Sequence, residues 1–244
     1  MSDILPYHQS LLIIPTYNEI ENIDLMLTSI THLYPELSIL IIDDGSPDGT
    51  ARVVKKFMDN SCKIHLIERE GKQGLASAYI AGFRWAIERE YLFIFQMDCD
   101  FSHDPKDIPN LLTGARSHDL IIGSRYIKGG RVINWPAYRL FLSYFAGFFT
   151  RIVTGLNISD VTSGYKCLTR SVLQELNFDS FFSKGYSFQI ELAYKIMNNN
   201  FKVKEVPITF HERSRGKSKM SSKIIYEALI NVVRLRLKKI SGTL

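Results

Sequence analysis

The sequence predicts one α/β domain of the Rossmann-like kind, with a mostly parallel central sheet and helices on both of its faces. Three observations indicate this class. Short apolar runs rich in β-branched residues recur through the first half of the chain, and stretches of helical periodicity alternate with them. With 244 residues and 45% hydrophobic content, the chain can bury one core of good size.

Five apolar runs are predicted strands, because each is short, β-branched and followed by polar or glycine residues. They cover residues 11–14, 39–42, 64–67, 92–95 and 120–122. Predicted helices cover residues 19–33, 50–59, 75–90 and 105–116. Asp48 or Thr50 can cap the second helix, and Asp104 stands before Pro105 at the start of the fourth. In such alternating folds, ligands bind at the carboxyl ends of the strands.

Beyond about residue 125 the pattern becomes helical and aromatic. Residues 203–210 are strand-like, and a late helix is expected over residues 223–239. We expect residues 1–220 to form the main domain and residues 221–244 a C-terminal amphipathic helix associated with a membrane surface. Six aromatic residues in the stretch 138–149 exceed what one buried stripe requires: Tyr138, Phe141, Tyr144, Phe145, Phe148 and Phe149. The residues expected to enter the lipid are Phe145, Phe149, Ile225, Leu229 and Val233.

The net charge is only +5, but basic residues gather late in the chain, within 213–223 and 234–239. This predicts an anionic partner. Phosphate, nucleic acid and an acidic membrane surface all satisfy that condition, and so does an ordinary solvated face. The run 213–223 has no aromatic residues for base stacking, which disfavours nucleic acid as a partner.

Cysteine usage and the terminal sequence indicate where the protein works. Cys62, Cys99 and Cys167 are odd in number and form no CxxC pair, which argues against a disulfide framework and favours a reducing compartment. The first ten residues lack the features of a signal peptide. The longest uncharged apolar stretch, residues 140–150, is shorter than the about 20 residues that a spanning helix needs. We therefore expect a cytoplasmic protein, peripheral on the cytoplasmic face of a membrane.

Polar clusters follow three of the predicted strands, in residues 15–19, 43–46 and 98–100. Asp98 and Asp100 stand two apart, so their carboxylates can reach one hard cation, Mg²⁺ or Mn²⁺, together with substrate phosphate oxygens. Alternatively, they cap the helix that follows. Asp43 and Asp44 lie at the same predicted edge, where carboxylates repel unless cations or hydrogen-bond donors compensate. Tyr17 can stack on a nucleobase, and a carboxylate can accept hydrogen bonds from a ribose or a base.

Six motifs make the sequence similar to the dolichyl-phosphate mannose synthases, which are inverting family-2 glycosyltransferases. In order, they are PTYNE, DDGSPDGT, MDCDFSHDP, GSRYIKGG, SKGYSFQIE and ERSRGKSKM. The resemblance spans residues 11–220, nearly the whole chain. It implies a glycosyltransferase A fold that transfers mannose from GDP-mannose to a polyprenyl (dolichyl) phosphate, with Mg²⁺ or Mn²⁺ as cofactor.

Site residues carry over from the resemblance position by position. Donor binding is implied for Pro15, Tyr17, Glu19, Asp43, Asp44, Asp98, Cys99, Asp100, Lys184, Arg213 and Lys219, with Asp98 and Asp100 holding the metal. Acceptor phosphate binding is implied for Arg125, Arg139 and Ser143, and catalysis for Asp100, Arg125, Arg139 and Arg213. Some relatives have glutamine where this chain has Ser102, so Ser102 departs from the family's metal shell. His103 is assigned to the start of the helix and not to base catalysis.

An ionised lipid phosphate can attack the sugar without a general base, so the implied chemistry is electrostatic, with inversion to a β-linked product. The partners implied are GDP-mannose, the lipid phosphate and a membrane surface, with a membrane-spanning partner subunit as a further anchor. Two alternatives stay open: transfer of a UDP-linked sugar such as glucose to undecaprenyl phosphate, and a non-catalytic nucleotide-binding membrane adaptor. A nicotinamide dehydrogenase is disfavoured, because the first strand leads into PTYNE and not into GxGxxG.

Overall fold

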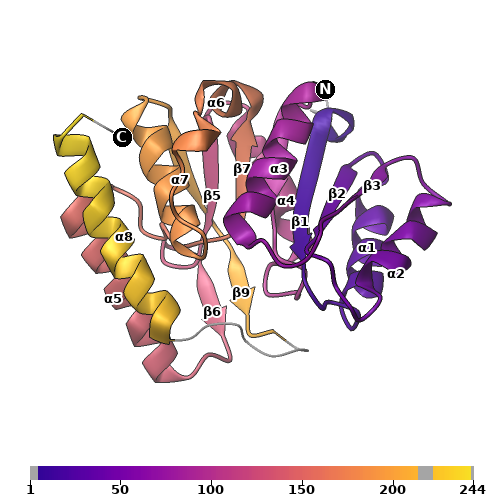
Figure 1. Cartoon of the computed structure of the whole chain (residues 1–244), viewed down its shortest axis with the longest axis horizontal. Helices are drawn as coiled ribbons and strands as arrows, with labels where there is room; N and C mark the ends of the chain where they lie inside the picture. The colour runs from indigo at the N-terminus through magenta and orange to yellow at the C-terminus, as the bar shows by residue number, and fades with distance from the viewer. Residues whose placement is uncertain (1–4, 214–221, 243–244) are drawn as a thin grey trace.

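Seven strands form one central sheet in the computed structural model, which describes residues 5–213 and 222–242. The strand order is β3-β2-β1-β4-β7-β5-β8 (Figure 1). The strands are β1 Ser10–Thr16, β2 Ser38–Asp43, β3 Ile64–Glu68, β4 Phe93–Gln96, β5 Leu120–Ser124, β7 Lys166–Thr169 and β8 Val203–Pro207. Two short strands, β6 Arg131–Ile133 and β9 Thr209–His211, pair in parallel as a second sheet.

Helices cover both faces of the main sheet. They are α1 Ile23–Leu33, α2 Thr50–Met58, α3 Leu75–Glu88, α4 Ile108–Ala115, α5 Ala137–Thr154, α6 Arg170–Glu175, α7 Ser187–Asn198 and α8 Ser222–Ile240. Short 3-10 turns occur at η1 Tyr7–Gln9, η2 Pro105–Asp107 and η3 Phe178–Ser180. The side chain of Asp104 accepts a hydrogen bond from the Lys106 N–H at the start of η2, as expected for a cap.

The predicted α/β class is confirmed, and each of the five predicted strands and four predicted helices is present within a few residues of its expected bounds. Two features differ from expectation. Strand β7 enters the sheet antiparallel to both β4 and β5. The strand-like run 203–210 divides at Ile208, so that β8 belongs to the main sheet and β9 to the small one.

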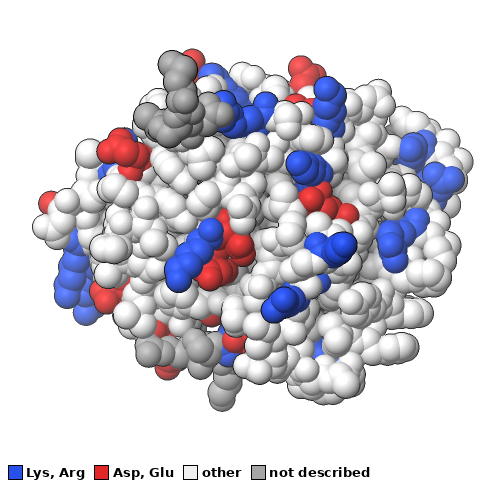
Figure 2. Space-filling view, turned by 180° about the vertical axis from the view of Figure 1, so that it is seen from behind, with Lys and Arg blue, Asp and Glu red and all other residues white. Residues whose placement is uncertain are grey.

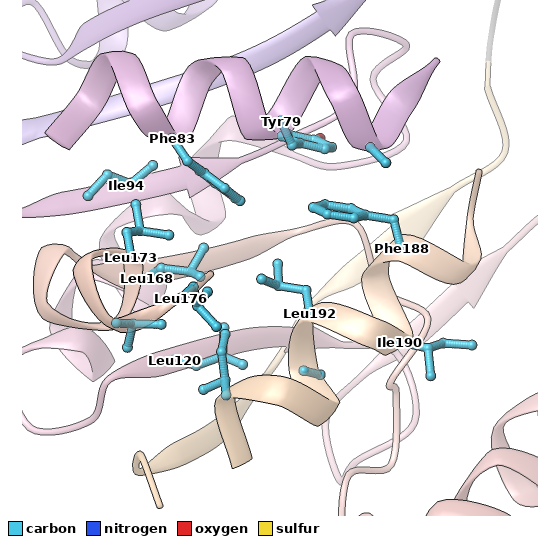
Figure 3. Packing of buried hydrophobic residues seen from close by; sticks show 14 of the residues in the cluster. Tyr79, Phe83, Ile94, Leu120, Leu168, Leu173, Leu176, Phe188, Ile190 and Leu192 are labelled. Atoms are coloured by element: carbon cyan, nitrogen blue, oxygen red, sulfur yellow. The ribbon is translucent and has the colours of Figure 1, made fainter. Parts of the chain in front are cut away.

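Two apolar clusters form the core, one on each face of the sheet. In β1, Leu11 and Ile13 join one cluster, whereas Leu12 and Ile14 join the other, because successive side chains of a strand point to opposite faces. Figure 3 shows part of the first cluster, where Tyr79 and Phe83 of α3 lie across from Phe188 of α7. Each fully buried side chain of this size stabilises the fold by about 1.5–3 kcal/mol.

Helix α8 packs along α5 and α7 at one end of the sheet, as Figure 1 shows. Its Val232 and Leu235 are buried in the first cluster, which accounts for one face of the helix. The expected late helix is therefore present, and it contacts the domain directly. No helix in the described part of the chain is long and apolar enough to cross a membrane.

Candidate active site

The carboxyl ends of β1, β2 and β4 meet at one edge of the sheet, because these strands are parallel neighbours in the order β2-β1-β4. The Asp44 N–H donates to the Thr16 carbonyl at 3.0 Å, which ties the loop after β2 to the end of β1. The three polar clusters that the sequence places after these strands therefore converge, as expected for a ligand site in an open α/β sheet.

Asp43 is almost completely buried, and its carboxylate organises the loops. It accepts hydrogen bonds from the Thr16 hydroxyl at 2.8 Å, the Ser46 hydroxyl at 2.6 Å and the Ser46 N–H at 2.8 Å. Asp44 forms an ion pair with Arg69 and accepts from the N–H groups of Gln73 and Gly74 at 3.2 and 3.0 Å. Both carboxylates are thus held in fixed orientations by compensating donors.

A fourth loop, residues 69–74 after β3, joins this edge and was not singled out from the sequence. Besides Arg69, it brings Lys72, whose Nζ lies 4.7 Å from the centroid of the Tyr17 ring. Gly45 lets the two loops approach, because a Cβ at this position would lie 2.7 Å from the Gly71 nitrogen. The strand-end rule that selected the other clusters applies equally to the polar run after residue 67.

The expected donor residue Pro15 lies near the end of β1, and Tyr17 and Glu19 lie in the loop that follows. The Glu19 carboxylate accepts a hydrogen bond from Asn22 at 2.8 Å, and its backbone N–H donates to Thr50 at 3.0 Å. Asn18 adopts a left-handed conformation with φ of 56°, and its N–H donates to the Ser46 hydroxyl. This turn places Tyr17 and Glu19 beside the Asp43–Asp44 loop.

Asp98 and Asp100 follow β4, as predicted, and a turn at Phe101 shapes their loop. Phe101 has a φ of 59°, a strained value for an aromatic residue. The turn lets Ser102 donate to Asp100 Oδ1 twice, from its N–H at 3.1 Å and from its hydroxyl at 2.5 Å. Ser102 therefore orients Asp100. The other oxygen, Asp100 Oδ2, lies 2.6 Å from Arg213 Nη2.

Electrostatics around the carboxylate pair favour a cation. Although 39% of the Asp98 side chain is accessible, the surrounding protein limits its solvation. This burial, together with the negative charge of Asp100, raises the pKa of Asp98 to about 7. Burial lowers the pKa of His103 to about 4. Because His103 Nδ1 accepts the Asp98 N–H at 3.3 Å, the ring proton lies on Nε2 and the imidazole is neutral.

The oxygen donors suit a hard divalent cation for which the protein supplies only some of the ligands. Two carboxylates at the end of β4 supply oxygen ligands, which Mg²⁺ and Mn²⁺ prefer. Among the described residues, no group of three or more His, Cys, Asp or Glu side chains gathers around one point. Such a pair needs further ligands from phosphate oxygens and water, as is usual where a nucleotide completes a magnesium site.

A pocket extends from the carboxylate pair into an apolar groove between α5 and α8. At its polar end it is lined by Asp98, Asp100, His103, Arg125, Arg139 and Arg213. At its apolar end the lining comes from Leu142 and Ala146 of α5 and from Leu229 and Val232 of α8. The pocket thus joins a charged end to an apolar end.

Arg125 lies at the junction of the two ends, but its charge is already paired. It donates from Nε and Nη2 to the two oxygens of Asp160, each at 2.6 Å, and both side chains are buried. Burial alone would lower the pKa of Arg125, but the charge and hydrogen bonds of Asp160 outweigh it and raise that pKa. A phosphate in the pocket would meet an arginine that Asp160 holds rigidly.

The other expected acceptor residues lie in the same pocket with partners of their own. Arg139 donates to Glu212 at 2.8 Å and lies over the Trp135 ring at 4.3 Å, and the Ser143 hydroxyl accepts from Tyr126 at 2.6 Å. On the donor side, Cys99 is buried, and Lys184 is exposed with its carbonyl bonded to the Ala76 N–H at the start of α3. Lys219 lies outside the described residues.

Lys166 is a buried lysine that the sequence did not single out. Its Nζ donates to the Ser163 carbonyl and to Gln189 Oε1, and burial lowers its pKa to about 7.

Between pH 7 and about 10.4 the unfolded chain binds a proton on Lys166 that the folded chain lacks. We therefore expect the free energy of unfolding to rise with pH here, by up to about 1.4 kcal/mol per pH unit from this group. Denaturant titrations of the wild type and Lys166→Met across this range should show the slope in the wild type alone; equal slopes would contradict it.

The arrangement defines a class of protein. Acidic and aromatic side chains at the carboxyl edge of a Rossmann-like sheet, with a carboxylate pair facing the pocket, are typical of enzymes that bind a nucleotide together with a divalent cation. The family described as "Glycosyl transferase family 2" matches residues 11–176. The chain belongs to this family of enzymes, which confirms the resemblance seen in its motifs.

Relatives support the same assignment. The chain is 43% identical to the undecaprenyl-phosphate mannosyltransferase of Micrococcus luteus, over 92% of each chain. It is also 43% identical to the polyprenol monophosphomannose synthase of Mycolicibacterium smegmatis, over 98% of this chain and 92% of the relative. The crystal structure of glucosyl-3-phosphoglycerate synthase from Mycobacterium tuberculosis with Mn²⁺, UDP and phosphoglyceric acid has a TM-score of 0.70, with 16% identity over 96% of this chain and 78% of that one. This likeness shows the fold.

Proposed function

We propose that the protein transfers mannose from GDP-mannose to a polyprenyl phosphate, giving a β-mannosyl phosphoryl lipid and GDP. The observation that carries this proposal is the pocket that joins the carboxylate pair to the apolar groove between α5 and α8. A lipid phosphate is the substrate whose two ends match the two ends of the pocket. The names of the two 43% identical relatives, both mannose transferases or synthases acting with polyprenyl carriers, agree with it.

On the donor side, Pro15, Tyr17, Glu19, Asp43 and Asp44 form the wall for the guanosine. Tyr17 offers a ring for stacking, and Lys72 beside it adds positive charge on this side of the site, which suits an anionic nucleotide. Asp98 and Asp100 would hold Mg²⁺ or Mn²⁺, which supplies charge neutralisation of the departing diphosphate. The structural neighbour from Mycobacterium tuberculosis binds Mn²⁺ together with UDP, which agrees with the use of a divalent cation.

On the acceptor side, the residues orient an anion that needs no deprotonation. A phosphate monoester is largely ionised near neutral pH, with a second pKa of about 6, so its oxygen attacks the anomeric carbon directly. Arg125 and Arg139 can donate to the phosphate, and Asp160 and Glu212 fix their guanidinium groups. His103 is neutral and lies against Tyr165 and Phe210, which agrees with a structural role. Attack opposite the diphosphate inverts the sugar configuration.

A transfer assay tests the donor and the acceptor together. Radiolabelled GDP-mannose and UDP-glucose are each incubated with a short polyprenyl phosphate, with and without Mg²⁺ or Mn²⁺. We expect metal-dependent formation of mannolipid. Glucolipid alone would assign the protein to the UDP-sugar branch, and no transfer from either donor despite nucleotide binding would indicate a non-catalytic adaptor.

The outer surface of α5 and α8 supports peripheral attachment to a membrane. Several large apolar side chains on α5 are at least half exposed, including Tyr138, Phe141, Phe145 and Phe148. Phe149 and Leu229 were also expected to enter the lipid. Instead, Phe149 packs against the core and Leu229 lines the pocket. The Ile225 side chain lies outside the described residues. Figure 2 shows that the side of the molecule carrying these helices, at the right, bears Lys and Arg among uncharged residues and little acidic surface. Apolar and basic side chains together suit an anionic bilayer, here the cytoplasmic leaflet.

Loss of the exposed α5 rings should weaken this attachment. The triple variant Phe141→Ser, Phe145→Ser, Phe148→Ser removes apolar surface that contributes about 1 kcal/mol of binding free energy for each ring half-buried in lipid. Binding to anionic liposomes should therefore fall about 100-fold in a flotation assay. The matched control, Leu25→Ser, Leu33→Ser, Met58→Ser, changes three exposed apolar residues of α1 and α2 and should bind as the wild type does. A wild type that ignores liposomes of every composition would point to a membrane-spanning partner subunit as the anchor.

A further inference from the structure

Both oxygens of Asp100 already accept hydrogen bonds from protein groups. Asp100 is also the more deeply buried carboxylate of the pair. Asp100 is 4% exposed; Oδ1 accepts from Ser102, and Oδ2 accepts from Arg213 Nη2 at 2.6 Å. Asp98 differs, because 39% of its side chain is accessible and the His103 Nδ1 beside it, 3.9 Å away, is neutral. A cation bound between the two carboxylates would therefore meet the positive charge of Arg213 at Oδ2.

The backbone before Arg213 is fixed against the carboxylate loop. The His211 N–H donates to the Ser102 carbonyl at 3.1 Å, and Phe210 pairs with His103 in a β-bridge. The Glu212 N–H donates to the Ile133 carbonyl at 3.2 Å, while its carboxylate holds Arg139. Arg213 can thus leave Asp100 by rotation of its side chain, with strand β9 in place.

We propose that Arg213 and the divalent cation are alternative occupants of Asp100, and that the nucleotide diphosphate decides between them. This inference rests on the proposed function for the identity of the nucleotide. A metal ion ligated by Oδ2 would lie at contact distance from the Arg213 guanidinium, where their like charges repel. A diphosphate resolves the competition, since it ligates the metal and offers Arg213 a new anionic partner.

The consequence is coupled binding. Without nucleotide, Arg213 occupies Asp100 and keeps the affinity for metal low. With nucleotide, Arg213 moves to phosphate and the metal site becomes available. By linkage, the factor by which GDP tightens metal binding equals the factor by which metal tightens GDP binding. The enzyme then binds little metal until a nucleotide is present, so the unproductive complex of enzyme and metal alone stays rare.

Mn²⁺ binding to the whole protein, measured by electron paramagnetic resonance of the free ion, tests this without sugar or lipid acceptor. For Arg213→Gln we expect Mn²⁺ to bind about tenfold more tightly than to the wild type in the absence of GDP, equivalent to about 1.4 kcal/mol. The enhancement of Mn²⁺ affinity by GDP should shrink by a similar factor. Mn²⁺ alone should also raise the unfolding temperature more in the variant, which at the same time verifies that it folds.

Arg139→Gln is the matched control, because Arg139 lines the same pocket but pairs with Glu212 and not with Asp100. Its Mn²⁺ affinity without GDP should change less than twofold. The proposal is overturned if Arg213→Gln leaves Mn²⁺ affinity unchanged, or if Arg139→Gln raises it equally, since the effect would then be one of general charge. Neither result depends on which sugar is transferred, so failure here is separate from failure of the transfer assay.

Discussion

Asp100→Ala should lower the turnover number at least about a thousandfold while leaving a folded protein. Asp100 lies at the end of β4, where its carboxylate faces the pocket and is oriented by Ser102. Its loss removes one of the two oxygen donors for the divalent cation, and cation stabilisation of a leaving diphosphate is worth several kcal/mol. Steady-state transfer of mannose at saturating metal measures the effect, and Mn²⁺ titration should show the accompanying loss of affinity.

Asp104→Ala separates this chemical effect from disturbance of the loop. Asp104 lies four residues further on and caps η2 through the Lys106 N–H at 2.9 Å. The variant should lose about 1 kcal/mol of stability, as helix caps do, with little change in turnover. Normal turnover in Asp100→Ala would sink the assignment of the metal site, and equal losses in both variants would show that the loop and not the carboxylate matters.

The parallel half of the fold could be predicted because its signal is local. Runs such as residues 39–42 are buried on both faces of the sheet, so they are continuously apolar and β-branched. Strand β7 has no such signal, because Lys166 lies within it, and its buried amine is satisfied in part by Gln189, which is distant in sequence. A charged residue in a short run looks like a loop, and only the completed fold shows that Gln189 satisfies its amine.

The candidate site divides in the same way. Asp98 and Asp100 could be placed because they follow a strand, and strand ends meet at one edge. The ion-pair partners of the carboxylates at this site could not be predicted. Arg69 pairs with Asp44 from the next loop, and Arg213 reaches Asp100 from a segment more than a hundred residues away. The conformation of Phe101, which turns Ser102 back to Asp100, has no sequence signature either, because a bulky residue rarely adopts a positive φ.

Asp160→Ala should have the largest effect on stability, about 3–5 kcal/mol less free energy of unfolding, because it leaves the buried Arg125 charge without its partner. The matched control is Asp179→Ala. Asp179 pairs with Arg84 at the same distance of 2.6 Å, but both side chains are more than half exposed, so the cost should stay below about 1 kcal/mol. Denaturant titrations measure both, and equal costs would contradict the importance of burial.

The pH dependence of this pair has the same sign as that of Lys166, because the unfolded chain again binds the extra proton, but it falls in the acid range. Burial would raise the pKa of Asp160, but the charge and hydrogen bonds of Arg125 outweigh it and lower that pKa below its ordinary value. A carboxylate with a depressed folded-state pKa contributes stability above the unfolded-state value of about 3.9, and the contribution is lost as pH falls through the folded-state pKa. The difference in unfolding free energy between the wild type and Asp160→Asn should therefore be constant near neutrality and shrink below about pH 4. A difference that persists unchanged in acid would mean that packing, and not the ion pair, holds Arg125 in place.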